Sequence, residues 1–343
     1  MNIQGNFLIT GGAGFIGSHL CEQLLEQGHS VVAIDDLSTG RLENIQHLQR
    51  KYSAQANAPG QDSRFQFVRE SISNALVLDR LTSNAQTVIH LAAAVGVKLI
   101  VDDPVYTIRT NIMGTEAVLN AANRYGCKVL IASTSEVYGK GVKIPFREED
   151  DRLMGPTTHS RWAYASSKAV DEFLGLAYHS QFSLPVIIVR LFNTVGPRQT
   201  GRYGMVVPRF VRQALNGEPL TVFGDGKQSR CFTDVADVVN ALSQLVSEPK
   251  ALGQVFNLGS TQEITIFQLA ERVKALTGSS SEIQFVPYSE AYAPGFDDMR
   301  RRVPSIEKIQ RLICFQPTYT LDDTLKRVIS FERQAYLNVS SNL

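Results

Sequence analysis

The chain has 343 residues, a formal net charge of +1, and a hydrophobic fraction of 43%. This size and apolar content are typical of one large globular domain or two packed ones. A nearly neutral charge gives no electrostatic basis for binding nucleic acid or an anionic membrane, so we expect neither as a partner.

The four cysteines are scattered along the chain, without a Cys-x-x-Cys pair or a nearby histidine cluster. This pattern predicts neither a disulfide framework nor a metal site, and it fits a reducing cytoplasm. An apolar run begins at Phe7 and leaves no room for a signal peptide. The longest apolar stretch, Thr87–Val101, is too short to span a membrane. We therefore predict a cytoplasmic protein.

Short apolar runs alternate with longer amphipathic segments through the first half of the chain. Helices are predicted at His19–Glu26, Tyr106–Arg124 and Tyr164–His179. Repeated strand–helix–strand order predicts an α/β fold with a doubly wound, mostly parallel sheet covered by helices on both faces. The predicted strands are Phe7–Thr10, Val31–Ile34, Phe65–Val68, Val88–Leu91, Val129–Ser133 and Val186–Leu191.

The pattern changes after about residue 195. Helices are predicted at Val206–Leu215 and Val235–Val246, with a strand at Leu220–Phe223 between them. We expect one unit over residues 1–195 and a smaller α/β C-terminal lobe over residues 196–335, with some later segments returning to the first unit. The polar segment Arg50–Ser63 is interpreted as a surface insertion.

A glycine-rich loop follows the first strand. Gly11 permits a tight turn, Gly14 lets the backbone approach a pyrophosphate, and Gly17 allows close packing of helix on strand. Phe15 and Ile16 belong to the same loop and are also predicted to bind the cofactor. The helix that follows the loop offers free N–H groups at its N-terminus to phosphates. The loop therefore predicts that residues 1–195 form a Rossmann-type dinucleotide-binding domain.

The second strand ends in two acids, Asp35 and Asp36. An acid about twenty residues beyond the glycine loop binds the adenine ribose hydroxyls in such domains. A carboxylate there repels the extra phosphate of NADP, so NAD is the predicted cofactor. Ser38, Thr39 and Gly40 follow and could complete the adenosine pocket. A helix cap is the alternative role for Asp35.

Tyr164 and Lys168 are four residues apart, hence on one face of a predicted helix. A phenol with a pKa of about 10 is a poor base at neutral pH, and an adjacent ammonium with the positive nicotinamide favours the phenolate. Surface packing is the alternative for such a pair. A preceding strand that ends in Ser133–Gly139 favours catalysis, because α/β sheets present ligand groups at strand ends.

The glycine loop, the segment His90–Ala93, the segment Ser133–Gly139 and the Tyr164-x-x-x-Lys168 pair together resemble the extended short-chain dehydrogenases. These are NAD-dependent sugar-nucleotide epimerases, dehydratases and decarboxylases, and the resemblance covers residues 5–330. It implies that Thr134, Tyr164 and Lys168 are catalytic. It also implies that the nicotinamide and pyrophosphate are lined by Leu91, Ala92 and Ala93.

The resemblance further implies that the second lobe holds a UDP-sugar. Asn193 corresponds to the family asparagine that touches the nucleotide diphosphate. Arginine suits diphosphate binding because its planar fork bonds phosphate oxygens in pairs. A solvated surface is the alternative for the run Arg300–Arg302. The remaining predicted substrate residues are Ser135, Arg198, Arg230 and Arg302.

Glu136 bears on the choice of reaction. Family members first oxidise the sugar at C4 to a ketone. Simple 4-epimerases commonly have a small or hydroxyl residue at this position, whereas decarboxylases and some dehydratases have glutamate. The segments Arg161–Tyr164 and Arg230–Asp234 are similar to the decarboxylase domain of the bifunctional enzyme of aminoarabinose synthesis. We therefore predict UDP-glucuronate decarboxylation with Glu136 as a catalytic residue.

Several alternatives stay open. The segment Ala94–Val97 lacks a proline often found in decarboxylases and favours a UDP-sugar 4-epimerase. A 4,6-dehydratase is a further alternative, and Glu136 could have only a structural role. An NAD-sensing protein without catalysis is disfavoured because Tyr164 and Lys168 are both present.

The resemblance also implies a homodimer. The segments Tyr106–Arg124 and Tyr164–Ala177 match two helices that pair into a four-helix bundle in this family. The alternative is that both helices simply cover the sheet within one subunit.

Overall fold

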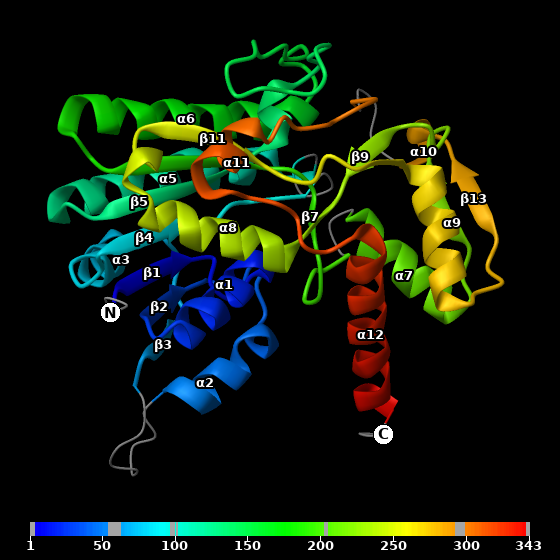
Figure 1. Ribbon diagram of the computed structural model, residues 1–343, viewed down its shortest axis with the longest axis horizontal. Coiled ribbons are helices and arrows are strands. Elements are labelled where there is room, and N and C mark those ends of the chain that lie inside the picture. The colour runs from blue at the N-terminus through cyan, green and yellow to red at the C-terminus, as the bar shows by residue number, and fades with distance from the viewer. Residues whose placement is uncertain are drawn as a thin grey trace.

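The computed structural model describes residues 4–53, 63–96, 100, 102–201, 205–291 and 299–340. A large sheet with helices on both faces forms one part of the molecule (Figure 1). A smaller group of helices and short strands lies beside the carboxyl-terminal edge of this sheet. The predicted α/β class with a doubly wound sheet is confirmed.

The large sheet has seven parallel strands in the order β11-β6-β5-β4-β1-β2-β3. Strand β1 pairs with β2 on one side and with β4 on the other, so Leu8 lies between Val32 and Val88. The direction of winding reverses between β1 and β4, which is where sheets of this kind bind ligands. The strands are β1 (Asn6–Thr10), β2 (Ser30–Ile34), β3 (Phe65–Val68), β4 (Thr87–His90), β5 (Lys128–Thr134), β6 (Val186–Leu191) and β11 (Gln254–Leu258).

Alternate side chains of each strand enter two separate hydrophobic cores. In β6, Ile187 and Val189 join the core on one face, while Ile188 joins the core on the other. This alternation follows from the two-residue period of a strand, and burial on both faces explains the continuous apolar runs in the sequence. The first core is covered by α1 (Phe15–Glu26), α2 (Gln46–Tyr52), α8 (Val235–Ser247) and α11 (Glu307–Ile313), and the second by α3 (Ala75–Thr82), α5 (Pro104–Tyr125) and α6 (Arg161–Phe182).

Two elements from the C-terminal half of the chain are part of the unit built around the large sheet. Helix α8 packs against α1, and β11 pairs in parallel with β6, with Val255 opposite Ile188. Sequence periodicity predicted a helix at α8 but no strand at β11. The division of the chain at residue 195 stays a prediction.

The smaller lobe has its own core of buried residues, among them Phe210, Leu269 and Leu325. Helix α9 begins with a capping box in which the Thr265 and Gln268 side chains bond each other's backbone N–H groups. The helices of the lobe are α7 (Val206–Asn216), α9 (Ile266–Thr277), α10 (Tyr288–Ala291) and α12 (Leu321–Ser340). Its strand pairs are β7 (Thr194–Val195) with β10 (Thr233–Asp234), β8 (Leu220–Phe223) with β13 (Ile283–Val286), and β9 (Ser229–Cys231) with β12 (Glu263–Thr265).

The interpretation of Arg50–Ser63 as a surface insertion is wrong at its start. Residues 50–52 form the last turn of α2. Leu48 and Tyr52, four residues apart, both enter the first core together with Phe65. Burial of this helix face overrides the polar composition of the segment, and residues 54–62 lie outside the described residues.

Candidate active site

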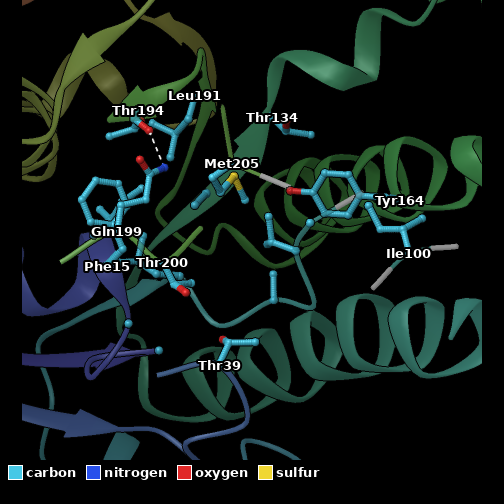
Figure 2. Close-up of a pocket in the computed structure, with 18 of the residues that line it drawn as sticks. Phe15, Thr39, Ile100, Thr134, Tyr164, Leu191, Thr194, Gln199, Thr200 and Met205 are labelled. Atoms are coloured by element: carbon cyan, nitrogen blue, oxygen red, sulfur yellow. Dashed lines mark hydrogen bonds between the residues drawn. The ribbon is translucent and has the colours of Figure 1, made fainter. Parts of the chain in front are cut away.

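A cavity of about 530 Å³ lies at the carboxyl ends of the sheet strands and is closed on its other side by the smaller lobe. Strands β2, β5 and β6 contribute residues to its wall, and so do the loops that directly follow β1 and β4. Figure 2 shows Tyr164 directing its hydroxyl group into this space, with Thr134 nearby and Phe15 and Thr39 across from it. The smaller lobe contributes side chains such as Arg230 and Tyr288. The cavity is therefore large enough and suitably placed for a nucleotide ligand.

The glycine loop forms one end of the cavity. Gly11 has a φ of +70°, and a Cβ atom there would lie 2.9 Å from the backbone nitrogen of Ala92. A Cβ atom on Gly17 would lie 2.1 Å from the carbonyl oxygen of Gly11. Helix α1 starts at Phe15 without a side-chain cap on its N-terminus, which leaves its first N–H groups for an anion. These residues fit the pyrophosphate of NAD.

Asp35 and Asp36 differ in their surroundings. Asp35 is buried, and its carboxylate accepts hydrogen bonds from the backbone N–H groups of Ala13 (3.0 Å) and Leu37 (2.8 Å). Burial raises the pKa of Asp35 above its usual range. Gly40 does not line the cavity but lies against Asp35, where a Cβ atom would come within 2.7 Å of the carboxylate. Asp36 is exposed at the cavity.

These two acids predict a preference for NAD over NADP. The 2′-phosphate of NADP would meet one or two carboxylates, so NADP should bind at least about tenfold more weakly. Equilibrium titration of the protein with each dinucleotide measures this ratio. The variant Asp36→Asn should reduce the ratio, and Asp79→Asn, outside the cavity, should not. Tighter binding of NADP than of NAD by the parent protein would overturn the argument.

Tyr164 and Thr134 form the catalytic candidate pair. Tyr164 lies in the first turn of α6 and is 7% exposed, and its hydroxyl group points toward Thr134 at the end of β5 (Figure 2). Burial raises the pKa of Tyr164, and the negative charges of Glu136 and Asp171 raise it further. The group is therefore a neutral phenol near pH 7.

Lys168 lies one turn further along α6 and does not itself line the cavity. Its side chain is buried, and its Nζ atom is 2.6 Å from Oδ2 of Asp171. Sequence reasoning did not single out Asp171. No local signal distinguishes it from other acids on a helix, because the pairing depends on burial.

His90 at the end of β4 is buried between Thr10 and Thr115, with hydrogen bonds of 2.8 and 3.0 Å to their hydroxyl groups. Burial, and then the charge of Lys168, lower the pKa of His90 to about 3 from its usual 6.5. In the unfolded chain the imidazole binds a proton below about pH 6.5, whereas in the folded chain it stays neutral. Stability is therefore full above pH 6.5 and is lost as the pH falls toward 3.

This shift predicts a loss of about 2 kcal/mol in the free energy of unfolding at pH 5 relative to pH 7.5 from His90 alone. Denaturant titrations at the two pH values measure the difference. The variant His90→Gln removes this titration, so its stability should vary less with pH. An equal dependence on pH in the parent and in the variant would contradict the assignment.

Glu136 lies between two arginines beside Tyr164. Its side chain is 13% exposed and forms ion pairs with Arg161 and, at 3.3 Å, with Arg302. Arg302 also donates a hydrogen bond of 3.0 Å to Oδ1 of Asn193. Burial raises the pKa of Glu136, but the charges of Arg161 and Arg302 outweigh this effect and hold the pKa at about 2. Glu136 is therefore a carboxylate at any physiological pH.

The Glu136 cluster, defined as Glu136, Arg161 and Arg302, changes two expectations. Arg302 was predicted to bind the diphosphate, but its guanidinium contacts Glu136 near Tyr164. Arg161 lines the cavity, is 3% exposed, and was not predicted as a site residue. Its place three residues before Tyr164 on α6 is the signal that could have indicated it.

The two other predicted arginines, Arg230 and Arg198, differ in their position relative to the cavity. Arg230 lines the cavity and donates hydrogen bonds of 2.8 Å to the carbonyl oxygens of Ser229 and Met299. Arg198 does not line the cavity, because its guanidinium turns toward α1 and pairs with Glu22 at 2.6 Å. The structure therefore does not bring Arg198 to the predicted substrate site.

Most of the predicted site residues lie together in the wall of the cavity, whereas Gly40, Lys168 and Arg198 are not part of it. The roles of all these residues stay predictions. The predicted residues that line the cavity are Gly11, Gly14, Phe15, Ile16, Gly17, Asp35, Asp36, Ser38, Thr39, Leu91, Ala92, Ala93, Thr134, Ser135, Glu136, Tyr164, Asn193, Arg230 and Arg302.

Within the ranges that the structure describes, no cluster of three or more histidine, cysteine, aspartate or glutamate side chains could hold a metal ion. None of the helices in the same part of the chain combines the length and apolar character needed to cross a bilayer.

A family model described as GDP-mannose 4,6 dehydratase matches residues 8–328. The chain belongs to this family. The predicted membership among the extended short-chain dehydrogenases, which are NAD-dependent sugar-nucleotide enzymes, is thereby confirmed.

Relatives within the family are named for several reactions. The chain is 42% identical over 328 residues to a UDP-N-acetyl-alpha-D-glucosaminuronate decarboxylase from Bacillus cytotoxicus, covering 95% of this chain and 97% of that protein. It is 36% identical to UDP-glucuronic acid decarboxylase 1 from Xenopus tropicalis, covering 98% and 74%. It superposes with a TM-score of 0.83 and 32% identity on a UDP-glucuronic acid 4-epimerase from Bacillus cereus solved with UDP-glucuronic acid and NAD, covering 96% and 100%.

Proposed function

We propose that this enzyme decarboxylates a UDP-linked uronic acid, with UDP-glucuronate as the predicted substrate, while holding NAD along the glycine loop. The Glu136 cluster carries the proposal. It places two guanidinium groups around one carboxylate beside Tyr164. Guanidinium groups bind carboxylates through charge-assisted hydrogen bonds, so they suit a substrate that carries a carboxylate of its own, that of the sugar. The substrates in the names of the two decarboxylase relatives carry such a group.

Each group at the site has a separate role in the proposed reaction. NAD, when bound, supplies the acceptor for the hydrogen on C4 of the sugar. Tyr164 takes the proton of the C4 hydroxyl group, and Thr134, whose side chain lies near the phenol, orients it. Oxidation at C4 places a ketone β to the C6 carboxylate, and a β-keto acid loses carbon dioxide readily. The electron pair of the C5–C6 bond then forms an enolate, which takes a proton at C5. The hydride removed in the first step returns to C4, and Tyr164 returns its proton to the C4 oxygen.

Within this proposal the arginines and Glu136 act on the carboxylate. Arg302 binds the carboxylate of the sugar, while Arg161 keeps Glu136 ionised and in place. The anionic Glu136 then lies near a second anion and raises its free energy, which favours loss of neutral carbon dioxide. Each 1.4 kcal/mol or so of this effect is about tenfold in rate.

A second candidate is 4-epimerisation of the same kind of substrate. The likeness to the Bacillus cereus 4-epimerase with UDP-glucuronic acid favours it. In that reaction the arginines would hold the carboxylate throughout, and hydrogen would return to the other face of C4.

Product analysis tests the proposal. The protein is incubated with NAD and separately with UDP-glucuronate, UDP-N-acetylglucosaminuronate and UDP-glucose, and the products are examined by mass spectrometry and NMR. We expect one or both uronates to lose carbon dioxide. An unchanged mass with inverted C4 would establish the epimerase, loss of water would establish a dehydratase, and NAD binding without turnover would establish a non-catalytic protein.

We also propose a homodimer that forms through α5 and α6. These helices pack against each other and expose apolar side chains, with Val105 and Phe173 each 65% exposed and Met113 59% exposed. Apolar groups at this spacing on two adjacent helices suit a four-helix bundle.

We keep the cytoplasm as the proposed location because all four cysteines are free thiols.

Sedimentation of the protein at micromolar concentration tests the dimer. The parent should sediment as a dimer, and Phe173→Glu on α6 should shift it to a monomer because a charge would enter the bundle. Leu76→Glu, at an 84% exposed position on α3, is the matched control and should stay dimeric. A monomeric parent would refute the dimer.

A further inference from the structure

The ion pair of Lys168 and Asp171 is enclosed in protein. The two side chains are 2% and 0% exposed, and the Nζ to Oδ2 distance is 2.6 Å. Opposite charges at this distance interact much more strongly away from water than at the surface. The ammonium group of Lys168 is therefore held in one place, three residues before its partner on α6.

A row of polar side chains leads from this pair to the cavity wall. Asp171 faces Thr115 on α5, and the Thr115 hydroxyl lies 3.0 Å from Nε2 of His90. Nδ1 of His90 lies 2.8 Å from the hydroxyl of Thr10. That hydroxyl accepts hydrogen bonds of 3.2 Å from the backbone N–H groups of Leu91 and Ala92, which line the cavity. The position of Lys168 is thus tied to the backbone that would meet a dinucleotide.

The other charged groups nearby are otherwise engaged. Glu172, the neighbour of Asp171 on α6, pairs with Arg190 at 2.7 Å. His90 on β4 is neutral near pH 7 because its pKa is low. On the Thr134 side, Glu136 pairs with Arg161 and with Arg302. Asp171 is thus the carboxylate that balances the charge of Lys168.

We propose that Asp171 is a positioning residue for Tyr164 and Lys168: it fixes the ammonium group, and its charge sets the pH range in which Tyr164 accepts a proton. This inference rests on the role of Tyr164 in the proposed function. An ammonium paired with a carboxylate exerts little net attraction on a nearby phenolate, whereas an unpaired ammonium favours it. Asp171 itself is among the charges that raise the pKa of Tyr164.

Two substitutions separate charge from position. Asp171→Asn removes the charge but keeps an oxygen that accepts from Lys168. The pH at which hydride transfer reaches half its maximum should then fall by about one unit, with NAD affinity changed less than about threefold. Asp171→Ala also releases the ammonium, so the dissociation constant for NAD should rise about tenfold. Asp171→Glu keeps the charge and should restore the profile of the parent.

Two readouts on the full chain are needed. Equilibrium NAD binding is measured by calorimetry and does not depend on any substrate. Single-turnover reduction of NAD by UDP-glucuronate is followed by absorbance between pH 5.5 and 9, and it reports only the oxidation at C4. Glu116→Gln, a partly exposed acid on α5 outside the cavity, is the control and should match the parent in both readouts.

An unshifted pH profile in a folded Asp171→Asn protein, or unchanged NAD affinity in Asp171→Ala, would overturn the proposal. If Asp171→Asn does not fold, Asp171→Ser takes its place. Failure of both neutral variants to fold, with normal folding of Asp171→Glu, would assign the pair a structural role and also overturn the proposal. Retention of the carboxylate by the parent would defeat the proposed function alone, because both readouts precede that step.

Discussion

Replacing Tyr164 by phenylalanine is expected to lower turnover by roughly a thousandfold, because the change removes the only atom of this side chain that can take a proton. The fold and the affinity for NAD should change little, since the ring keeps its buried place in the first turn of α6. Product formation from UDP-glucuronate measures the loss of turnover. Thermal unfolding measures the stability of the fold, and NAD titration measures the affinity for NAD.

The same helix supplies a control for this substitution. Tyr178 also lies on α6, but its hydroxyl group bonds Asn120 on the outside of the molecule. Tyr178→Phe removes the same atom away from the cavity and should retain the activity of the parent. Near-normal activity of Tyr164→Phe would remove this tyrosine from the mechanism.

The second large effect is expected for Glu136→Gln. This variant keeps the shape of the side chain but removes the charge that faces the proposed site of the sugar carboxylate. The ground state of that carboxylate would then be better stabilised by Arg161 and Arg302, so release of carbon dioxide should slow about a hundredfold, equivalent to about 3 kcal/mol. Oxidation at C4 should slow much less, because Tyr164 and Thr134 stay in place. Reduced NAD should therefore accumulate.

Rapid measurement of both steps separates these effects. Absorbance follows the reduction of NAD, and trapped carbon dioxide follows the second step. Glu307→Gln alters another arginine-paired glutamate, on the surface at α11, and should affect neither step. Decarboxylation by Glu136→Gln at the rate of the parent would leave Glu136 with only a structural role.

Local pattern was sufficient to predict much of this molecule. Each predicted strand from Phe7–Thr10 to Val186–Leu191 is a strand in the structure. Central strands such as β6 are buried on both faces, which requires a continuous apolar run. The glycine loop and the Tyr164–Lys168 spacing are also local, since they depend on one turn of backbone or one turn of helix. These features required no knowledge of distant contacts.

What the sequence did not reveal depends on contacts between distant segments. Strand β11 joins the large sheet only because β6 offers it an edge. The residues of the Glu136 cluster come from the turn after β5, from α6 and from the segment before α11. No spacing in the sequence predicts that these three segments come together. Arg198 matches a family position, yet the pairing with Glu22 on α1 turns it from the cavity.

The central claim is that the sugar loses its carboxylate, and the fate of C6 tests it most directly. The protein is given NAD and UDP-glucuronate labelled with carbon-13 at C6, and the label is followed in trapped carbon dioxide and in the sugar. The account predicts one labelled carbon dioxide for each UDP-glucuronate consumed, with an unlabelled UDP-pentose as product. Label that stays in the sugar while the substrate is consumed would contradict it.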